Sequence, residues 1–420
     1  MKRFGALPDT HHNPVPVPAP VSFPFPTCGD SDSVQRQVQQ AAAEFGVGDQ
    51  RRQSAAASRF RGGMVTNGST TGRDCRRVAN ETGMIGAGVM MSGQVREATA
   101  TAHPNIALVK YWGKSDIERN IPAVGSLSIT LDALRTTTTV RFDPGLDHDR
   151  FLLDGREVPK MGERVAACLD RVRQRAGSSL HAVVESSNNF PTAAGLASSA
   201  SGFAALVVAA DAALGSGLGR VELADLARRA SGSAARSLFS GFAEIELVDR
   251  DGAREARTRQ VLEPDEWPLR VVVAVAEAGP KAVGSTEGMV RTEQTSPFYA
   301  TWVKSSAADL EGARRAIEDR DFQALAEISE SSCLKMHAVM LSARPGLIYW
   351  NGTTVECVHR IRALRDGGVP VFFTIDAGPQ VKAVCLPEAV TVVRNELELV
   401  PGVRHIIESG LGNGARVIGA

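Results

Sequence analysis

The sequence predicts an α+β protein with two lobes, preceded by a long segment outside the fold. Three observations predict this class. Apolar residues recur at strand and helix spacing from about residue 97 onward, the two kinds of segment alternate without a regular strand–helix–strand repeat, and the first 95 residues lack such a pattern. With 420 residues, 43% of them hydrophobic, the chain can fill the cores of two domains. We expect the units 1–95, 96–265 and 266–420.

The N-terminal segment has the composition of a chain that does not fold alone. It contains the run "NPVPVPAPVSFPFP", which favours an extended conformation, followed by a polar stretch rich in Gly and Ser. We interpret it as a disordered extension, or as upstream sequence included by a wrong start codon, because Met84, Met90 and Met91 precede the folded pattern. A regulatory arm is the alternative.

The charge balance and the cysteines restrict the class of protein. Lys plus Arg and Asp plus Glu both number 47, which argues against a chain-wide nucleic-acid surface but allows a local basic pocket. Six scattered cysteines without a C-x-x-C pair indicate reduced thiols and argue against zinc. No apolar run approaches the roughly 20 residues of a membrane helix. We therefore expect a cytoplasmic protein with no membrane partner.

Strand patterns open the first lobe. The stretches 98–114 and 125–143 are β-rich, and the alternation in "TTTVRF" is typical of a half-buried strand. Val165, Leu169 and Val172 have the spacing of an amphipathic helix. The other elements predicted here are a strand at 181–190 and helices at 202–214 and 221–232.

The second lobe mixes the same kinds of element. We expect a strand at 268–277, a long helical segment over 305–340 and a buried strand at 369–378. His337 lies in a Met- and Leu-rich helical stretch, where a lone histidine usually packs, so we expect a structural role for it.

The loop "PTAAGLASSAS" has the parts of a phosphate cradle. Gly195 permits close backbone approach, serines supply hydroxyl groups, and a helix follows whose first amide groups would point at an anion. The loop is neither a Walker A motif, which needs Gly-Lys-Ser/Thr, nor a Gly-x-Ser-x-Gly nucleophile elbow. Taken alone, it fits a Ser-capped, tightly packed helix equally well.

Four segments, in this order, resemble one known family: "NIALVKYWGK", "NFPTAAGLASSASG", "SGSAARSLFSGF" and "FTIDAGP". The loop is similar to the Pro-x-x-x-Gly-Leu-x-Ser-Ser-Ala motif of the GHMP kinase superfamily, and the four together resemble the mevalonate diphosphate decarboxylases. The resemblance runs from Thr99 to the C-terminus. It implies a two-lobed GHMP-kinase-like fold with a ribosomal-protein-like N-terminal lobe, which binds ATP, and a ferredoxin-like C-terminal lobe.

The same resemblance implies a reaction and its partners. The family converts mevalonate 5-diphosphate and ATP to isopentenyl diphosphate, carbon dioxide, phosphate and ADP, with Mg²⁺ accompanying ATP and no metal ligands that we can assign. It also implies a homodimer. The rival hypotheses are a mevalonate 3-kinase or a monophosphate decarboxylase of the same fold, a non-catalytic nucleotide-binding sensor, and a sugar kinase of the superfamily.

Asp376 is the candidate catalytic carboxylate. It follows the apolar run "VPVFFTI", and a carboxylate at the end of a buried strand is costly unless it is paired or used. A turn-forming aspartate in an Asp-x-Gly-Pro bend is the alternative. The resemblance implies that Asp376 orients or deprotonates the tertiary hydroxyl of the substrate, and that Arg236 and Lys110 share in catalysis.

Basic residues are the candidates for substrate binding. Lys110 and Lys114 are four residues apart around a glycine, so one ammonium group can serve the reacting centre and the other a diphosphate, unless both are solvated. Arg236 offers a planar fork for an acid group, or else is a surface arginine. By resemblance, the substrate-binding residues are Tyr111, Trp112, Gly113, Lys114, Arg164, Ser231, Gly232, Ser233, Ala234, Ala235, Arg236 and Thr295. Arg164 is alternatively an exposed helix charge and Thr295 an ordinary loop hydroxyl.

The resemblance also implies nucleotide contacts, and this sequence differs from the usual family pattern at three places. By resemblance, the residues that bind ATP are Pro191, Ala194, Gly195, Leu196, Ala197, Ser198, Ser199 and Ser201. Ala235 stands where the family often has Ser or Cys, Val124-Gly125 where Asn-Ser is more familiar, and Gln380 where Asn is usual. These departures concern substrate selectivity rather than the proposed chemistry.

Removal of residues 1–90 tests the predicted boundary of the fold. Because this segment has too little periodic apolar surface to join a core, the truncated protein should stay soluble and active, with a thermal midpoint within a few degrees of the full chain's. Expression of both forms, followed by thermal unfolding and an activity assay, makes the comparison. Loss of soluble, active protein would show that the segment belongs to the fold.

Overall fold

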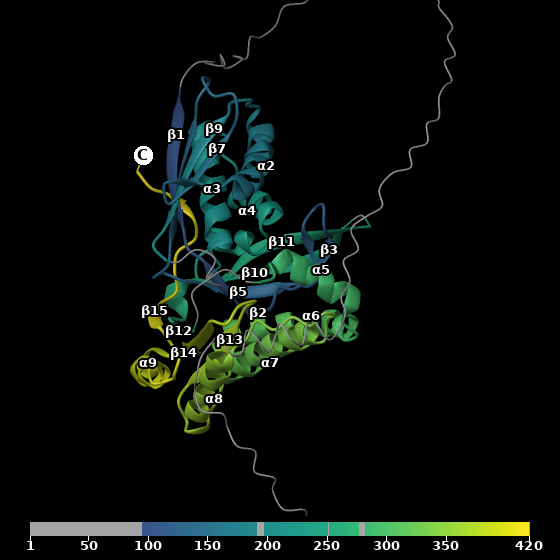
Figure 1. The fold of residues 1–420 in the computed structure, drawn as a ribbon, viewed down its shortest axis with the longest axis vertical. Helices are drawn as coiled ribbons and strands as arrows, with labels where there is room; N and C mark the ends of the chain where they lie inside the picture. The colour runs from purple at the N-terminus through teal and green to yellow at the C-terminus, as the bar shows by residue number, and fades with distance from the viewer. Residues whose placement is uncertain (1–94, 191–196, 251, 277–281, 420) are drawn as a thin grey trace, which may run out of the picture. The chain divides into compact units, whose positions relative to one another are not determined.

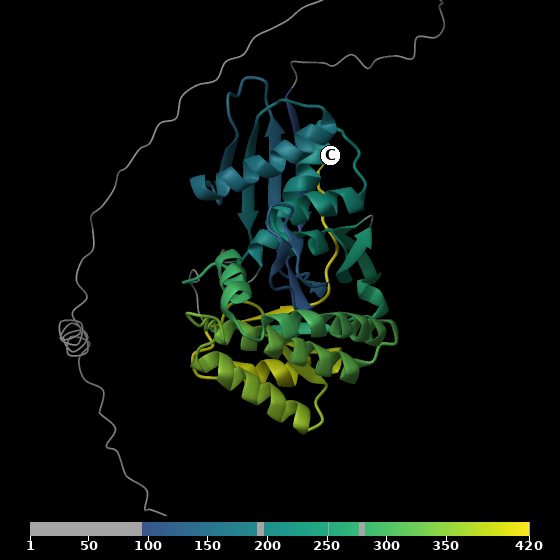
Figure 2. The ribbon, with the colours of Figure 1, turned by 90° about the vertical axis from the view of Figure 1, so that its right-hand side faces the viewer.

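The α+β class predicted from the sequence is confirmed. The computed structural model describes residues 95–190, 197–250, 252–276 and 282–419. The predicted N-terminal extension and the loop residues Pro191, Ala194, Gly195 and Leu196 lie outside the described residues. Within that range, three sheets and a small hairpin are covered by helices (Figures 1 and 2).

The largest sheet is mostly antiparallel and carries the predicted threonine-rich strand. Its strands, in spatial order, are β16 (Arg416–Val417), β1 (Arg96–Ala102), β6 (Thr136–Phe142), β9 (Ala182–Asn188), β7 (Arg150–Leu153) and β8 (Arg156–Glu157). Side chains of β6 alternate between buried and half-buried, as the strand period requires. Only β7 and β9 run parallel within this sheet.

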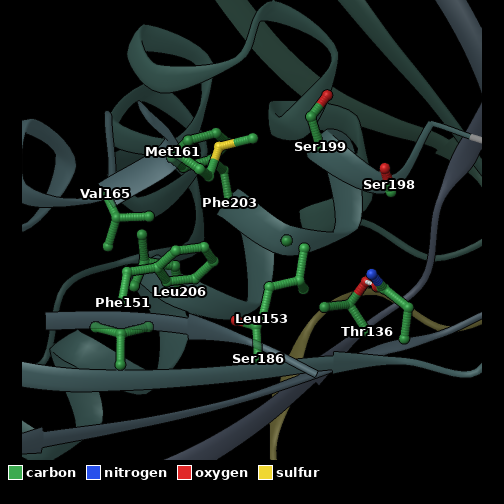
Figure 3. A pocket seen from close by; sticks show the side chains of 13 residues that line it. Thr136, Phe151, Leu153, Met161, Val165, Ser186, Ser198, Ser199, Phe203 and Leu206 are labelled. Atoms are coloured by element: carbon green, nitrogen blue, oxygen red, sulfur yellow. Dashed lines mark hydrogen bonds between the residues drawn. The ribbon is translucent and has the colours of Figure 1, made fainter. Parts of the chain in front are cut away.

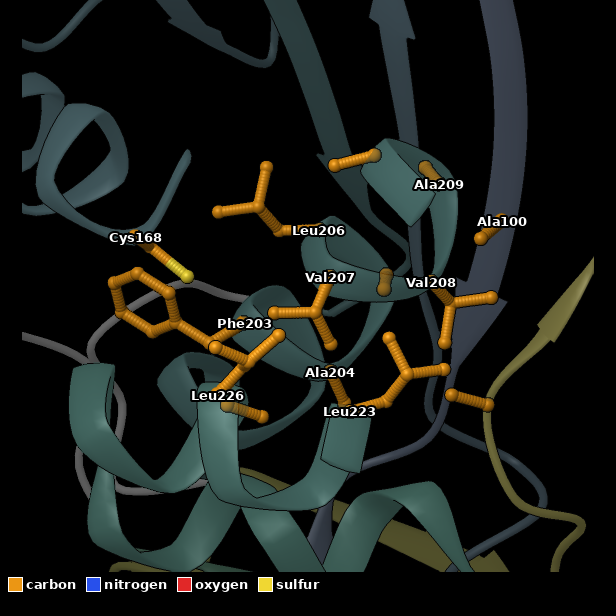
Figure 4. Close-up of a cluster of buried hydrophobic side chains, with 14 of the residues drawn as sticks. Ala100, Cys168, Phe203, Ala204, Leu206, Val207, Val208, Ala209, Leu223 and Leu226 are labelled. Carbon is orange, nitrogen blue, oxygen red and sulfur yellow. The ribbon is translucent and has the colours of Figure 1, made fainter. Parts of the chain in front are cut away.

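Three helices pack together and against the largest sheet. They are α2 (Pro159–Ala176), α3 (Ser198–Leu214) and α4 (Arg220–Ala230). Helix α3 is apolar and buried almost all round, because it lies between the sheet and the other two helices. Figure 4 shows α3 side chains packed between Cys168 of α2, Leu223 of α4 and Ala100 of β1. The first turn of α3, which follows the predicted phosphate loop, is therefore held by a close-packed core.

The second sheet lies beneath the first lobe's helices in Figure 1. Its antiparallel strands, in order, are β11 (Ala253–Leu262), β10 (Phe242–Arg250), β5 (Ser126–Thr130) and β2 (Asn105–Val109). Every residue of β2 and β5 is buried. The short helix η1 (Gly232–Leu238) joins α4 to β10, and the hairpin of β3 (Lys114–Asp116) and β4 (Ile121–Pro122) follows β2.

The third sheet is antiparallel and begins after the predicted boundary near residue 265. Its strands, in order, are β13 (Val371–Ile375), β14 (Val381–Cys385), β12 (Arg270–Val275) and β15 (His405–Ser409). The helices of this part are η2 (Pro264–Glu266), α5 (Ser285–Thr295), α6 (Tyr299–Glu318), α7 (Phe322–Leu341), α8 (Gly352–Asp366), η3 (Pro387–Ala389) and α9 (Val390–Glu398). The last strand, β16, returns to pair with β1.

The helical stretch predicted over 305–340 is two helices rather than one. Helix α6 ends at Glu318, Arg320 adopts a left-handed conformation, and the Asp321 carboxylate accepts the Ala324 amide at 3.0 Å to begin α7. Apolar spacing continues through this turn because both helices bury one face, which is why periodicity alone concealed the break. Helix α7 then contacts both β2 and β13, and so connects the second and third sheets.

None of the described helices combines the length and apolarity needed to cross a membrane.

Candidate active site

The ends of β2 and β13 bring together two residues separated by 266 positions in the chain. Lys110 follows β2, and its ammonium group donates to Oδ1 of Asp376 at 2.8 Å and to the Ala107 carbonyl at 2.9 Å. Asp376 follows β13, and Thr374 Oγ1 donates to the same Ala107 carbonyl at 3.0 Å. Shared hydrogen bonds to Ala107 therefore fix the two strand ends against each other.

A second lysine reaches the other oxygen of the carboxylate. Lys382 Nζ in β14 lies 3.2 Å from Asp376 Oδ2. Both lysine side chains are 1% exposed, whereas the Asp376 side chain is 29% exposed, so the carboxylate is the member of this trio most open to solvent. Burial alone would raise the pKa of Asp376, but Lys110 and Lys382 outweigh it and hold that pKa well below its usual range.

Asp376 opens onto a cleft of about 600 Å³. The predicted site residues that line it are Lys110, Tyr111, Trp112, Lys114, Arg164, Ala197, Ser199, Ser231, Gly232, Ser233, Arg236 and Asp376. They come from β2, β3, α2, α3, η1 and β13 or from the loops beside these elements. The cleft therefore collects most of the predicted substrate residues.

Arg236 is a buried cation that has no acidic partner among the described residues. Its side chain is buried, and the guanidinium donates to Ser126 Oγ at 2.6 Å, to Ser128 Oγ at 2.8 Å and to Asn105 Oδ1 at 3.3 Å. Burial lowers the pKa of Arg236 to about 10, against the opposing influence of Asp376, so it stays charged at neutral pH. No carboxylate of the described residues lies within 4.0 Å of it. A fixed cation held only by neutral oxygens favours an anionic ligand.

A second group of cations lies at another wall of the cleft. Lys114 of β3 and Lys160 and Arg164 of α2 line it together. Arg164 donates to the Ala230 carbonyl at 3.0 Å and lies over the Phe203 ring, 5.0 Å from its centroid. Burial lowers the pKa of Lys114, and Arg164 lowers it further. This wall therefore suits a multiply charged anion.

Two aromatic residues that line the cleft have buried donor atoms. Tyr111 Oη and Trp112 Nε1 are buried, with no hydrogen-bond partner among the described residues. Burial raises the pKa of Tyr111 to about 12, so its hydroxyl keeps its proton. A Cβ on Gly232 would overlap the Tyr111 hydroxyl, and Gly113, with φ of 94°, passes close to Tyr299. Glycine at 113 and 232 thus lets the aromatic rings approach the backbone.

The start of α3 connects the cleft to an apolar cavity. Ala197, with φ of 57°, precedes the helix, and Ser199 Oγ lies 3.3 Å from Ser231 Oγ. Ser199 lines both the cleft and a second cavity, which Ser198 also lines and whose other walls are mainly apolar (Figure 3). Phe151, Leu153, Met161 and Leu206 are among those walls. An amphiphilic ligand could extend from one space into the other.

Several predicted residues lie elsewhere. Ser201 is fully buried and its hydroxyl contacts Thr136 Oγ1 at 2.6 Å. Ala234 and Ala235 belong to the core beneath η1. Thr295 Oγ1 donates to the Arg291 carbonyl at 2.6 Å and accepts the Arg344 amide at 2.8 Å at the end of α5. These four side chains do not line the cleft, and neither does Gly113.

His337 packs in the core, as expected. Trp350 Nε1 donates to His337 Nε2 at 3.2 Å, and the two ring centroids lie 4.5 Å apart with their planes tilted by 44°. Burial and, to a smaller extent, Lys110 lower the pKa of His337 to about 3, so the ring is neutral.

The cleft contains functional candidates that the sequence did not single out. They are Asn105, Lys160 and the first residues of α5, Ser285 and Thr286. A further candidate, Lys382, lies behind Asp376 and does not line the cleft. Lys382 carried a usable signal, because a lysine inside the apolar run "VKAVC" is as unexpected as the aspartate after "VPVFFTI". The others are polar residues at element ends, where nothing local distinguishes them.

The side chains of the described residues limit how a metal ion could be bound. Among the described residues, no group of three or more His, Cys, Asp or Glu side chains could hold a metal ion. A divalent cation in this cleft would therefore take most of its ligands from phosphate oxygens and water, which is how Mg²⁺ is commonly bound with nucleotides.

Known proteins match both halves of the chain. The diphosphomevalonate decarboxylase-like N-terminal domain matches residues 102–255, and the mevalonate 5-diphosphate decarboxylase C-terminal domain matches residues 271–408. The diphosphomevalonate decarboxylase of Rattus norvegicus is 38% identical over 339 residues, which cover 73% of this chain and 79% of the relative. The Homo sapiens enzyme is 38% identical over 328 residues, covering 73% and 80%.

Solved structures agree. A complex of MDDEF with MVAPP, AMPPCP and magnesium has a TM-score of 0.72 at 38% identity, covering 78% of this chain and 100% of that one. The mevalonate diphosphate decarboxylase of Staphylococcus aureus has a TM-score of 0.73 at 38% identity, with coverage of 78% and 99%.

Proposed function

Because this chain belongs to the diphosphomevalonate decarboxylase family, we propose that it converts mevalonate 5-diphosphate and ATP to isopentenyl diphosphate, carbon dioxide, phosphate and ADP. One observation carries the proposal for this chain's own residues. An ionised carboxylate, Asp376, faces a cation-rich cleft in which Arg236 has no acidic partner within the part of the chain that the structure describes. A phosphorylated alcohol with an acid group would supply anions for the cations of the cleft and a hydroxyl for Asp376.

The cleft offers a complement to each polar part of this substrate. Arg236 would hold the substrate carboxylate, since its planar fork donates to neutral oxygens and pairs with no acid of the described residues. Asp376 would accept a hydrogen bond from the tertiary hydroxyl of the substrate. Lys114, Lys160 and Arg164 would neutralise the diphosphate. Tyr111 Oη and Trp112 Nε1, which have no hydrogen-bond partner among the described residues, would complete the binding of the diphosphate oxygens.

ATP would lie along the start of α3, in the lobe formed by residues 96–265. The α3 N-terminus attracts phosphates through its free amides, and Ser199 faces the cleft. The apolar cavity beside Ser198 would receive the base (Figure 3). The predicted loop residues Pro191, Ala194, Gly195, Leu196 and Ala197 would also contact ATP.

Magnesium belongs to the proposal because the MDDEF complex holds it together with AMPPCP. The residues present fit it, since Ser199 can supply a hydroxyl ligand next to the nucleotide phosphates, as in other phosphate sites. When bound, the ion would neutralise charge on the transferred phosphoryl group.

The reaction would begin with positioning of the hydroxyl. Asp376 has too low a pKa to be a strong base, but phosphoryl transfer needs little proton removal until the new bond is forming. The hydroxyl oxygen attacks the γ-phosphorus of ATP, the bond to ADP breaks, and Asp376 accepts the proton late. Lys110, which donates to Asp376 at 2.8 Å, is close enough to neutralise charge that develops on the phosphorylated oxygen.

Decarboxylation would follow because phosphate is a better leaving group than hydroxide. The bond between the tertiary carbon and the phosphorylated oxygen breaks, and phosphate departs with its electron pair. Electrons of the bond to the carboxylate then form the new double bond, and carbon dioxide leaves. Because its pKa is held low, Asp376 would pass the accepted proton to an oxygen of the new phosphate group, which carries the proton away when it leaves. The carboxylate restored in this way would stabilise the positive charge that develops at the tertiary carbon.

We also propose that the protein works in the cytoplasm and as a homodimer. Cys168, Cys333, Cys357 and Cys385 are buried free thiols, which suits a reducing cytoplasm. The family resemblance supports a homodimer.

A substrate panel tests the function directly. Mevalonate, its monophosphate and its diphosphate would each be offered with ATP and Mg²⁺ while ADP and carbon dioxide are measured together. We expect both products in equal amounts and the highest kcat/KM with the diphosphate, because three basic side chains line the wall proposed for it. ADP without carbon dioxide would identify a kinase, and nucleotide binding without turnover would favour a sensor.

Asp376→Asn tests the carboxylate. Loss of the charge should lower kcat by about 10²- to 10⁴-fold, while binding of an ATP analogue changes less than about twofold. Asp309→Asn is the matched control, because Asp309 is also paired with a lysine, Lys335, but outside the cleft. If the Asp376 variant kept near-normal kcat, the assigned role would be wrong.

Arg236→Ala tests recognition of the acid group. We expect kcat/KM for mevalonate 5-diphosphate to fall about 30-fold or more, with ATP affinity nearly unchanged, because a desolvated charge contact is lost. Arg173→Ala is the control: Arg173 is buried but paired with Asp149 and Asp170 outside the cleft. It should destabilise the protein without changing kcat/KM of the folded fraction. Equal effects of the two substitutions on kcat/KM would remove Arg236 from the site.

A further inference from the structure

Lys382 is a buried cation that neither substrate binding nor the proposed chemistry uses. It lies in the middle of β14, opposite Thr374 of β13 and Val273 of β12. The side chain is 1% exposed. Placing an ammonium group inside a sheet is costly, and an apolar side chain of similar size would commonly stabilise the fold better. Its presence therefore points to a role other than packing.

The geometry connects this lysine to the reacting carboxylate. Lys382 Nζ lies 3.2 Å from Asp376 Oδ2, whereas Lys110 Nζ lies 2.8 Å from Oδ1. Lys110 and Asp376 line the cleft, but Lys382 does not. The carboxylate is thus held between one lysine on the substrate side and one on the interior side.

The other charged and titratable groups around Asp376 do not replace Lys382. Arg236 from η1 acts on it only at longer range and is bound by serine hydroxyls. His337 and Cys333 on α7 are neutral, because burial lowers the pKa of the histidine and raises that of the thiol. Among these neighbours, Lys110 and Lys382 are the two cations within 4.0 Å of the carboxylate.

We propose that Lys382 is a positioning residue that keeps Asp376 ionised and oriented while Lys110 turns its ammonium group to the phosphorylated oxygen of the substrate. The inference rests on the proposed function. Lys110 cannot give full charge to both Asp376 and a new phosphate. When Lys110 moves toward the phosphate, Lys382 still holds Oδ2 of Asp376. Oδ1 therefore keeps pointing toward the reacting carbon and oxygen.

The arrangement also predicts the sign of a pH effect. Protonation of Asp376 removes the reacting carboxylate, so activity falls as the pH drops through its pKa. Two lysines hold that pKa low, which places the acid limb at low pH. Without Lys382 the pKa rises toward the ordinary range and the acid limb moves to higher pH.

Lys382→Met is the direct test. We expect kcat to fall about 10- to 100-fold, the usual cost of removing a group that orients a reacting side chain. KM for both substrates should stay within about twofold, and the acid limb of kcat should move to higher pH. Lys382→Arg, which keeps the charge, should leave the acid limb in place and recover part of kcat.

Lys335→Met is the matched control. Lys335 is a partly buried lysine on α7, paired with Asp309, and does not line the cleft. It should lose some stability but keep the wild-type kcat and acid limb. If Lys382→Met also kept the wild-type kcat within twofold and the same acid limb, the inference would be overturned.

A measurement without substrate separates this inference from the proposed function. Infrared difference spectra against Asp376→Asn report the ionisation of Asp376 in the ligand-free protein. At pH 5 we expect a carboxylate in the wild type and a measurable protonated fraction in Lys382→Met. Identical titrations would contradict the inference even for an active enzyme, whereas failure of the wild type to use mevalonate 5-diphosphate would contradict the proposed function.

If Lys382→Met does not fold, Lys382→Arg decides. The inference expects kcat below wild type with an unshifted acid limb, because the guanidinium keeps the charge but meets Oδ2 at a different distance. Wild-type kcat for every folded Lys382→Arg molecule would count against a positioning role.

Discussion

The site depends on one electrostatic arrangement: a carboxylate is held between two buried ammonium groups where two sheets meet. Asp376 and Lys382 come from one hairpin of the third sheet, and Lys110 from the end of the second. None of these charges would be stable alone at this depth. Together they compensate each other, and only the carboxylate is presented to the cleft to a substantial degree.

The chain has no net formal charge, but its cleft is rich in cationic side chains. Lysines and arginines equal aspartates and glutamates in number. Elsewhere arginines such as Arg173 and Arg314 are paired with acids, whereas Arg236 is bound by serine hydroxyls and an asparagine oxygen. The cleft thus contains a cation that is not paired with an acid of the described residues, which favours anionic ligands. Tyr111 and Trp112 add two hydrogen-bond donors beside it.

Local patterns predicted much of the fold and part of the site. Alternation in β6, helical spacing in α2 and the apolar run of β13 were all visible, as were Asp376 and Lys110 as candidates. The pairing of those two residues spans 266 positions, so only tertiary structure could reveal it. Lys382 was missed because its partner comes from a neighbouring strand. The break between α6 and α7 was missed because the apolar period continues across it. Ser201 was predicted to bind ATP, but it is buried and contacts Thr136 of the neighbouring sheet, a tertiary contact that local sequence does not show.

The most direct test of this account is a crystal structure of the protein with mevalonate 5-diphosphate and a non-hydrolysable ATP analogue. The account predicts the tertiary hydroxyl within hydrogen-bond distance of Asp376, with Lys382 still bound to the far carboxylate oxygen and the substrate carboxylate at Arg236. An Asp376 side chain turned away from the ligand into solvent would contradict it.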